Sequence, residues 1–192
     1  MGRPKLLLAF EDTTLAGALI RALLRAGVER VVVVLAPGAD ELRSRLGGAT
    51  GVEIVENPRP ERGMLSSVLC GLEALGGAAA IAAAQEPVLV TPADLPAIQP
   101  ATIRRLIAAV RDSGASLVVP THRGKRGHPL AIAPCVLLDV PGLDPAAGLH
   151  QLLDRHPVMR LVVEDPGVLA DVDTPAEYER LRAAAELRTR PR

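Results

Sequence analysis

The most informative segment of the sequence is Pro87-Val88-Leu89-Val90-Thr91-Pro92-Ala93-Asp94-Leu95-Pro96. Its apolar run has the length and β-branching of a buried strand, and a carboxylate follows just past the end of that run. In an open parallel α/β sheet, ligands bind in the crevice beyond the carboxyl ends of the strands. A carboxylate at such a position can meet a metal ion. The alternative is that Asp94 only caps a turn between two prolines, and this segment alone favours neither interpretation.

The composition of the chain fits one α/β domain. Its 192 residues are enough for a large core without disulfides or structural metals, and 48% of them are apolar. The chain has no Trp, one Tyr and one Phe. The core is therefore expected to consist of Val, Leu, Ile and Ala, as in a parallel sheet between helices. We expect residues 1–192 to form a single domain, with an irregular segment at 121–148 on the substrate side and a frayed tail at 189–192.

Charge and apolar patterning argue against nucleic acid and membrane partners. Lys and Arg together number 22, as do Asp and Glu, so no global field attracts a polyanion. The near absence of aromatic residues removes the usual stacking platforms for single-stranded nucleic acid. No apolar run is long enough to span a bilayer or to act as a secretory signal. Cys70 and Cys135 share no metal-ligand spacing with the histidines and are interpreted as small apolar residues of a reduced compartment, which predicts a cytoplasmic location.

Helical and strand patterns alternate along the chain. Strands are predicted at 30–35, 52–56, 88–91, 116–120, 129–133 and 161–164, and helices at 14–26, 39–46, 64–75, 101–113, 149–155 and 175–188. Residues 76–84 are interpreted as a helix end or a loop. Repeated strand–helix–strand units with short links imply right-handed crossovers and a mostly parallel sheet covered on both faces. The predicted fold class is therefore α/β.

Loops that follow the predicted strands are expected to meet at one edge of the sheet. The first runs from Asn57 through Gly63 into a helix that begins near Ser66 and Ser67. Backbone amides at a helix N-terminus bind anions, and Gly63 permits close approach of a ligand. Ordinary capping of the first helical turn is the alternative role for the two serines. The second loop carries Asp94.

The third loop, residues 123–129, crowds three cations and His128 into a glycine-flanked turn. A solvated charge cluster is the usual meaning of such a run, but its place between strands favours contact with a phosphate or an acceptor. Only Lys5 and Lys125 are lysines in a chain that otherwise uses arginine. A compact ammonium suits phosphate, although codon composition explains the bias equally well.

The fourth loop carries two carboxylates at alternate positions, Asp171 and Asp173, just before Pro175. Alternation puts both on one side of an extended segment. One of them is expected to cap the following helix or to interact with its dipole. The other is free to meet a metal, and Mg²⁺ commonly uses one or two carboxylates together with substrate phosphates.

Five motifs, in matching order and spacing, resemble those of the molybdenum cofactor nucleotidyltransferases, and most closely the cytidylyltransferase branch. The motifs are Met1-Gly2-Arg3-Pro4-Lys5-Leu6-Leu7-Leu8, the run from Asn57 to Gly71 that contains Gly63-Met64-Leu65-Ser66-Ser67, then Asp94-Leu95-Pro96, Gly127-His128-Pro129 and Asp171-Val172-Asp173-Thr174-Pro175. The resemblance covers nearly the whole chain. It implies a three-layer, Rossmann-like α/β/α nucleotidyltransferase fold.

The same resemblance implies an activity and a set of site residues. Such enzymes join a nucleoside monophosphate, here CMP from CTP, to the phosphate of molybdopterin and release pyrophosphate, with Mg²⁺ as cofactor. The catalytic residues would be Lys5, Asp94 and Asp173, with the two carboxylates as metal ligands. The nucleotide-binding residues would be Lys5, Asn57, Gly63, Ser66, Ser67 and Gly71, and the acceptor-binding residues Lys125, Gly127 and His128. The implied partners are a nucleoside triphosphate, a molybdopterin-type acceptor and molybdoenzymes.

The chain departs from the family pattern at its start. In the family, a first strand and a glycine-rich turn, read as Leu-Ala-Ala-Gly-x-Ser-x-Arg, precede the Met-Gly-x-x-Lys segment, whereas this sequence begins at Met1. We expect a fold without that strand and with two unpaired strand edges, the cause being a start codon assigned too late or a truncated chain.

Two alternative functions stay open at this point. One is a non-catalytic relative that binds a nucleotide or cofactor, which the absent turn supports. The other is a nucleotidyltransferase with another acceptor, such as a sugar phosphate. The choice between CTP and GTP is also open, although Gly127-His128-Pro129 and the double serine favour CTP.

Overall fold

The sheet of this protein is built in two parts. The computed structural model describes residues 4–189 of the chain. In the first part, β3 (Val31–Leu35) and β4 (Val52–Glu56) run parallel in a register that sets Val31 opposite Val52. Their β-branched residues favour the extended conformation. The helix α2 (Asp40–Leu46) supplies the crossover between them, as the alternation of patterns predicts.

The second part of the sheet is mixed. Its strands are β5 (Val88–Val90), β6 (Leu117–His122), β7 (Lys125–Arg126), β8 (Leu130–Ile132) and β9 (Val158–Val162). The order is β5-β8-β6-β7, and β9 pairs parallel with the other edge of β6. The strand β8 runs antiparallel to both β5 and β6, so those two strands are parallel to each other. The predicted α/β class is confirmed, with one antiparallel strand inserted among parallel ones.

The segment expected to be irregular supplies that inserted strand. Residues 121–148 contain β7, β8 and the 3₁₀ helix η3 (Pro134–Gly142). The chain leaves β6, turns back at residues 123–124 into β7, and continues in the same direction into Leu130–Ile132, which lies between β5 and β6 and is buried throughout. Its Gly- and Pro-rich composition thus belongs to turns around a short central strand.

Two strand edges are unpaired in the part of the chain that the structure describes. There β3 pairs only with β4, β5 pairs only with β8, and no strand pairs with both β3 and β5. This is the arrangement expected for the fold without its first strand. The three residues of β5 are half-buried, unlike those of β8.

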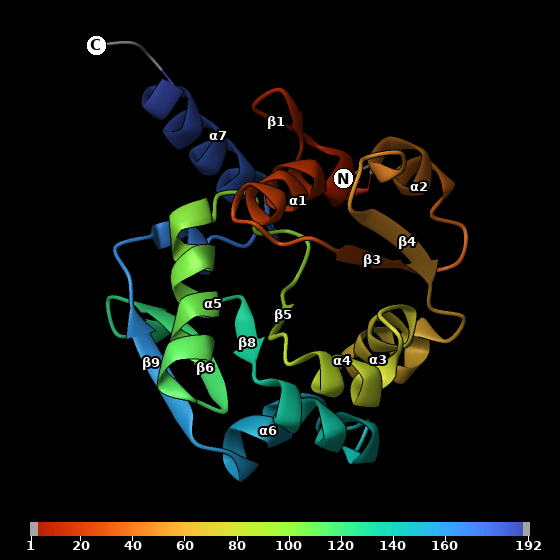
Figure 1. The fold of residues 1–192 in the computed structure, drawn as a ribbon. Helices are drawn as coiled ribbons and strands as arrows, with labels where there is room; N and C mark the ends of the chain where they lie inside the picture. Colours follow the sequence, from red (N-terminus) through yellow and green to blue (C-terminus); the bar gives the residue numbers. More distant parts are fainter. Residues whose placement is uncertain (1–3, 190–192) are drawn as a thin grey trace.

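Helices lie on both sides of the strands and complete three layers (Figure 1). They are α1 (Leu15–Arg25), α3 (Met64–Ala74), α4 (Gly77–Ala84), α5 (Pro100–Ser113), α6 (His150–Arg155) and α7 (Pro175–Thr189). One core cluster joins α1, α2 and the start of α5 to β3. A second joins α3, α4, η3 and α6 to β6 and β8. As the sequence predicts, this core is almost entirely aliphatic, with Phe10 as its one buried aromatic side chain among the described residues.

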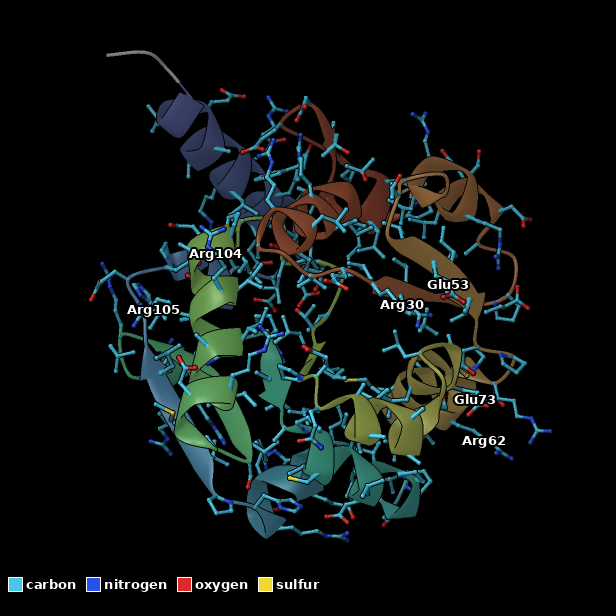
Figure 2. The ribbon with its side chains drawn as sticks, in the orientation of Figure 1. Arg30, Glu53, Arg62, Glu73, Arg104 and Arg105 are labelled. Atoms are coloured by element: carbon cyan, nitrogen blue, oxygen red, sulfur yellow. The ribbon has the colours of Figure 1, made fainter. Side chains whose placement is uncertain are left out.

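The side chain of Arg30 joins α3 to the first part of the sheet. The guanidinium of Arg30 donates to Glu53 at 3.1 Å, across β3 and β4, and to the carbonyl of Ala74 at 3.0 Å. Figure 2 labels Arg30 and Glu53 at the same end of these strands. Because Ala74 is the last residue of α3, this contact also serves as a cationic cap at the helix C-terminus.

Four local predictions differ from the structure. Residues 77–84 form a separate helix, α4, because Gly76 and Gly77 both have positive φ and turn the chain between the two helices. The strand β9 begins at Val158, earlier than predicted, because its mostly exposed edge position lacks a buried apolar pattern. A short hairpin of β1 (Ala9–Phe10) and β2 (Thr13–Thr14) was not expected. Finally, α7 extends through Thr189, and the rest of the predicted frayed tail lies outside the described residues.

Membrane-spanning potential is low among residues 4–189. None of the helices there is long and apolar enough to cross a bilayer alone. Only α3 and α4, a pair bent by 60°, reach that length and apolar composition when they are taken together.

Candidate functional site

Three charged side chains from distant parts of the chain meet beside the end of β5. The Nζ atom of Lys5 lies 2.6 Å from Oδ2 of Asp94 and 2.8 Å from Oδ1 of Asp173. Lys5 begins the 3₁₀ helix η1 (Lys5–Leu7), Asp94 lies in the loop after β5, and Asp173 precedes α7. The structure therefore brings together the three residues predicted to be catalytic, which are 89 and 168 positions apart.

Asp94 is held by the loop in which it lies. The chain leaves β5 at Val90, and Leu95, next to Asp94, is 1% exposed in the core cluster that contains α1. This anchor leaves the Asp94 side chain at the surface of the core with 14% of its area exposed. Asp94 therefore has a fixed backbone and a largely desolvated carboxylate.

The Asp173 carboxylate is available to the site because other residues cap α7. The Glu177 carboxylate accepts the backbone N–H groups of Asp173 and Thr174, and the Thr174 hydroxyl accepts the N–H of Glu177. This is a capping box, with threonine at the N-cap and glutamate three residues on. The prediction that Asp171 or Asp173 caps the helix is therefore wrong, since Thr174 and Glu177 satisfy its first amides.

The electrostatics of the cluster follow from these contacts. Hydrogen bonds from Lys5 to Asp173 and Asp94 stabilise the ammonium and raise the pKa of Lys5 above its usual 10.5, against the opposite effect of burial. The same Lys5 contact lowers the pKa of Asp173 below its usual 3.8. The contact therefore favours the charged forms of Lys5 and Asp173.

The donor set fits a divalent cation that is shared with phosphates. The Oδ1 atom of Asp94 is buried and has no hydrogen-bond partner among the described residues. An unpaired buried carboxylate oxygen is costly, and a hard cation would satisfy it. No cluster of three or more His, Cys, Asp or Glu side chains occurs within residues 4–189 that could hold a metal alone. Asp94 and Asp173 would therefore hold a cation only in part and leave positions for ligand oxygens.

A cavity of about 290 Å³ opens beside Asp94. It is lined by Pro92, Asp94, Leu95, Arg126, Gly127, His128, Val168, Leu169 and Asp171. Partial burial lowers the pKa of His128 below its usual 6.5, while the Asp171 and Asp94 carboxylates act in the opposite direction. The cavity thus presents a guanidinium, an imidazole that is neutral at pH 7, and two carboxylates.

Close backbone packing shapes this cavity at Gly127. A Cβ atom at this position would lie 2.3 Å from the carbonyl oxygen of Val168, so only glycine fits. The next residue, His128, donates its backbone N–H to the same carbonyl at 2.9 Å. Gly127 and His128, both predicted on the acceptor side, therefore border the same cavity as Asp94. Lys125, the third predicted acceptor residue, lies exposed in β7 and does not line this cavity.

A buried carboxylate that the sequence analysis did not identify ties the site loops together. Asp165 is 2% exposed and accepts hydrogen bonds from the amide of Gln99, the hydroxyl of Thr102 and the amide of Gly167. Gly167 packs so closely that a Cβ would lie 2.3 Å from the carbonyl oxygen of Ala97. Asp165 thereby joins the loop after Asp94, the start of α5, and η4 (Pro166–Leu169), which leads to Asp171 and Asp173.

The residues predicted to bind the nucleotide form a self-contained loop before α3. Asn57 is 1% exposed, and its amide donates to the hydroxyls of Ser66 at 2.8 Å and Ser67 at 3.0 Å. The Ser66 hydroxyl donates to the carbonyl of Gly63 at 2.7 Å, and Gly63 has a φ of 84°. Gly63 is the N-cap of α3 and no side chain caps that end of the helix, so the capping role considered as the alternative for the two serines is wrong. None of the loop residues lines the cavity beside Asp94.

The last predicted nucleotide-binding residue, Gly71, has a packing role. A Cβ at Gly71 would lie 3.4 Å from a methyl group of Val34, at the short end of ordinary van der Waals contact. Gly71 therefore lies on the face of α3 that packs on β3.

Comparison with known proteins identifies the family to which this chain belongs. A family model described as MobA-like NTP transferase domain matches residues 1–162. The molybdenum cofactor cytidylyltransferase of Escherichia coli (strain K12) is 27% identical over 179 residues, which is 93% of this chain and 86% of that protein. A phosphoenolpyruvate guanylyltransferase of Rubrobacter xylanophilus is 30% identical over 174 residues, which is 90% of this chain and 80% of that protein.

A solved structure extends the comparison to a metal complex. The complex of Rv0371c from Mycobacterium tuberculosis H37Rv with manganese is 28% identical and has a TM-score of 0.69, covering 95% of this chain and 93% of that chain. Related proteins thus include two kinds of nucleotidyltransferase and one protein seen with a divalent cation. Since the family model spans most of the sequence, this chain belongs to the MobA-like NTP transferases, a family of nucleotidyltransferases.

Proposed function

We propose that this protein transfers a nucleotidyl group from a nucleoside triphosphate to a small acceptor that carries a phosphate, with release of pyrophosphate. The observation that carries the proposal is the contact of Lys5 with both Asp94 and Asp173. Two carboxylates with one unpartnered buried oxygen suit a divalent cation, and an ammonium beside them suits a triphosphate. We take Mg²⁺ as the cation.

In this mechanism an acceptor phosphate oxygen forms a bond to the α-phosphorus while the bond to pyrophosphate breaks. The electron pair of that bond leaves with pyrophosphate, and no covalent enzyme intermediate forms. A cation held by Asp94 and Asp173 would neutralise charge that grows on the phosphate oxygens. Lys5 donates to the triphosphate, and Gly127 and His128 hold the acceptor. The protein thus acts by positioning and electrostatics.

For the substrates, we propose CTP and molybdopterin. The order of the five motifs and the 27% identity to a molybdenum cofactor cytidylyltransferase support this choice. Asn57, Gly63, Ser66, Ser67 and Gly71 remain the residues proposed for the nucleotide. Lys125 is kept as an acceptor contact, although it would have to reach the acceptor from outside the cavity. Delivery to molybdoenzymes stays a prediction without further support.

A second acceptor is favoured by the cavity beside Asp94. Arg126 and His128 line a space of about 290 Å³, which suits a small acid with a phosphate and a carboxylate. The 30% identity to a phosphoenolpyruvate guanylyltransferase supports phosphoenolpyruvate with GTP as the second candidate. A sugar phosphate is the third.

A product assay tests the proposal. The protein is incubated with Mg²⁺ or Mn²⁺, with CTP or GTP, and with molybdopterin, phosphoenolpyruvate or a sugar phosphate. Pyrophosphate release and the mass of the product are then measured. We expect one triphosphate and one acceptor to give a dinucleotide-type product. Asp94→Asn should lower that rate by at least about a hundredfold, because charge stabilisation in the transition state is usually the largest catalytic effect.

The matched control for Asp94→Asn is Asp112→Asn, which removes a carboxylate from the exposed end of α5. Its rate should equal that of the wild type. If no pair of substrates releases pyrophosphate, although calorimetry detects binding of a triphosphate, the protein is a non-catalytic nucleotide-binding relative.

A further inference from the structure

The ammonium of Lys5 occupies the space between two carboxylates that the proposed function assigns to a divalent cation. Its two hydrogen-bond partners, at 2.6 and 2.8 Å, are Asp94 and Asp173, one oxygen of each. Lys5 has 35% of its side-chain area exposed, so the ammonium can move outward into solvent. In the structure the Lys5 ammonium therefore lies where the divalent cation would bind.

A metal ion and this ammonium cannot share the same carboxylate oxygens. Mg²⁺ binds oxygens at about 2.0–2.1 Å and demands near-octahedral geometry, and it repels a positive charge at hydrogen-bond distance. An ion on the unpartnered Oδ1 of Asp94 would lie close to the ammonium that is bound to Oδ2 of the same carboxylate, and their repulsion is relieved when Lys5 moves away. The flexible four-carbon stem of lysine permits such a movement.

The cost of this movement depends on what accompanies the ion. A free ion breaks two charge-assisted hydrogen bonds and leaves Lys5 without a partner, since no other partner of its ammonium occurs within the described residues. An ion that arrives on a triphosphate brings phosphate oxygens, which accept the released ammonium. Lys5 thus loses its hydrogen bonds when a free ion binds. When the ion arrives with a triphosphate, Lys5 exchanges them for hydrogen bonds to phosphate.

We propose that Lys5 is a specificity-determining residue that reserves the Asp94–Asp173 pair for a divalent cation delivered with a triphosphate. The part about the triphosphate rests on the proposed function. The part about the cation alone does not. Lys5 thus acts as an internal competitor of the free metal ion before it acts as a triphosphate ligand.

Binding of Mn²⁺ in the absence of nucleotide tests the competition directly. The free Mn²⁺ signal in electron paramagnetic resonance is followed as the protein is added. Lys5→Met should bind Mn²⁺ about tenfold more tightly than the wild type, because no hydrogen bond has to be broken. Arg155→Met removes one positive charge from α6, at the far side of the molecule from α1 (Figure 1), and should leave the affinity unchanged. Adding Asp94→Asn to Lys5→Met should abolish the gain.

The two lysines of the chain allow a second test on the unaltered protein. Lysines are acetylated with a water-soluble reagent, and the modification of Lys5 and Lys125 is measured by mass spectrometry. Lys125 is exposed and serves as the internal reference. Mn²⁺ at a concentration that occupies the site should raise the labelling of Lys5 relative to Lys125 severalfold, because it releases the ammonium.

The outcomes separate this proposal from the proposed function. Equal or weaker Mn²⁺ binding by Lys5→Met, or unchanged Lys5 labelling, overturns the competition even if the protein transfers nucleotides. Tighter binding and increased labelling support it even if no acceptor is ever found. Should Lys5→Met fail to fold, the labelling of the wild type decides alone.

Discussion

At the scale of single residues, the candidate site depends on side chains that change partners. Lys5 is bound to carboxylates in the structure but is proposed to bind phosphates in the reaction. Asp94 keeps one buried oxygen without a partner. Such unsatisfied groups are rare in folded proteins and gather where ligands bind. The loops that follow the predicted strands indicated that Asp94 and Asp173 lie at one sheet edge, whereas the place of Lys5 in the site was implied only by the family resemblance.

The imidazole of His128 makes the stability of the protein depend on pH. Its pKa is lowered by partial burial, so the folded protein binds a proton less readily than the unfolded chain. Stability is therefore expected to fall as the pH drops from 7 through about 6.5 and below. Urea unfolding at pH 7 and pH 5.5 should show a smaller loss for His128→Gln than for the wild type. An equal loss would mean that other groups cause the decline.

At the scale of elements, short contacts between loops hold the site in shape. The loops after β5 and around η4 are joined by Asp165, and the loop after β7 joins them through the carbonyl of Val168. None of this was predictable from sequence. The three donors to Asp165 are two backbone amides and a hydroxyl, and two of them lie more than 60 positions away. Patterns of apolar residues carry no signal for such contacts. The capping box of α7 was readable from Thr174 and Glu177, and was overlooked.

Asp165→Asn tests this element-level arrangement. Asparagine has one oxygen where the carboxylate has two, so its amide group must face one of the three donors. One buried donor then loses its partner, which costs about 1–3 kcal/mol. Urea unfolding should show a loss of that size. In Asp112→Asn, an exposed substitution, the change should stay within about 0.5 kcal/mol. A neutral Asp165→Asn would show that the loops are held by packing alone.

At the scale of the whole molecule, the fold was more predictable than the site. The strands β3 and β6 have runs of β-branched apolar residues, and α1 and α5 have clear helical periodicity. β9 is mostly exposed, so its register was uncertain from sequence. The position of β8 was not predictable either. The position of this three-residue strand in the sheet is determined by its pairing with β5 and β6, and its own residue pattern does not specify those partners.

The division of the sheet into two parts leads to a prediction for hydrogen exchange. Val31 donates to Gly51, and Leu35 accepts from Asn57, so β3 bonds to β4 through alternate residues. The amides of Val32 and Val34 therefore point toward the edge that is unpaired in the described part of the chain. In β6, by contrast, Val118 is paired with both β8 and β9.

Valine amides on the two strands provide a matched comparison, because their intrinsic exchange rates are similar. Val118 is fully buried in a central strand and should exchange only through large-scale unfolding. Val32 and Val34 should exchange through local fluctuations, at rates at least about a hundredfold higher. Exchange followed by nuclear magnetic resonance resolves each amide. Equal protection of all three valines would mean that the edge of β3 is covered in solution, and that the two parts of the sheet act as one.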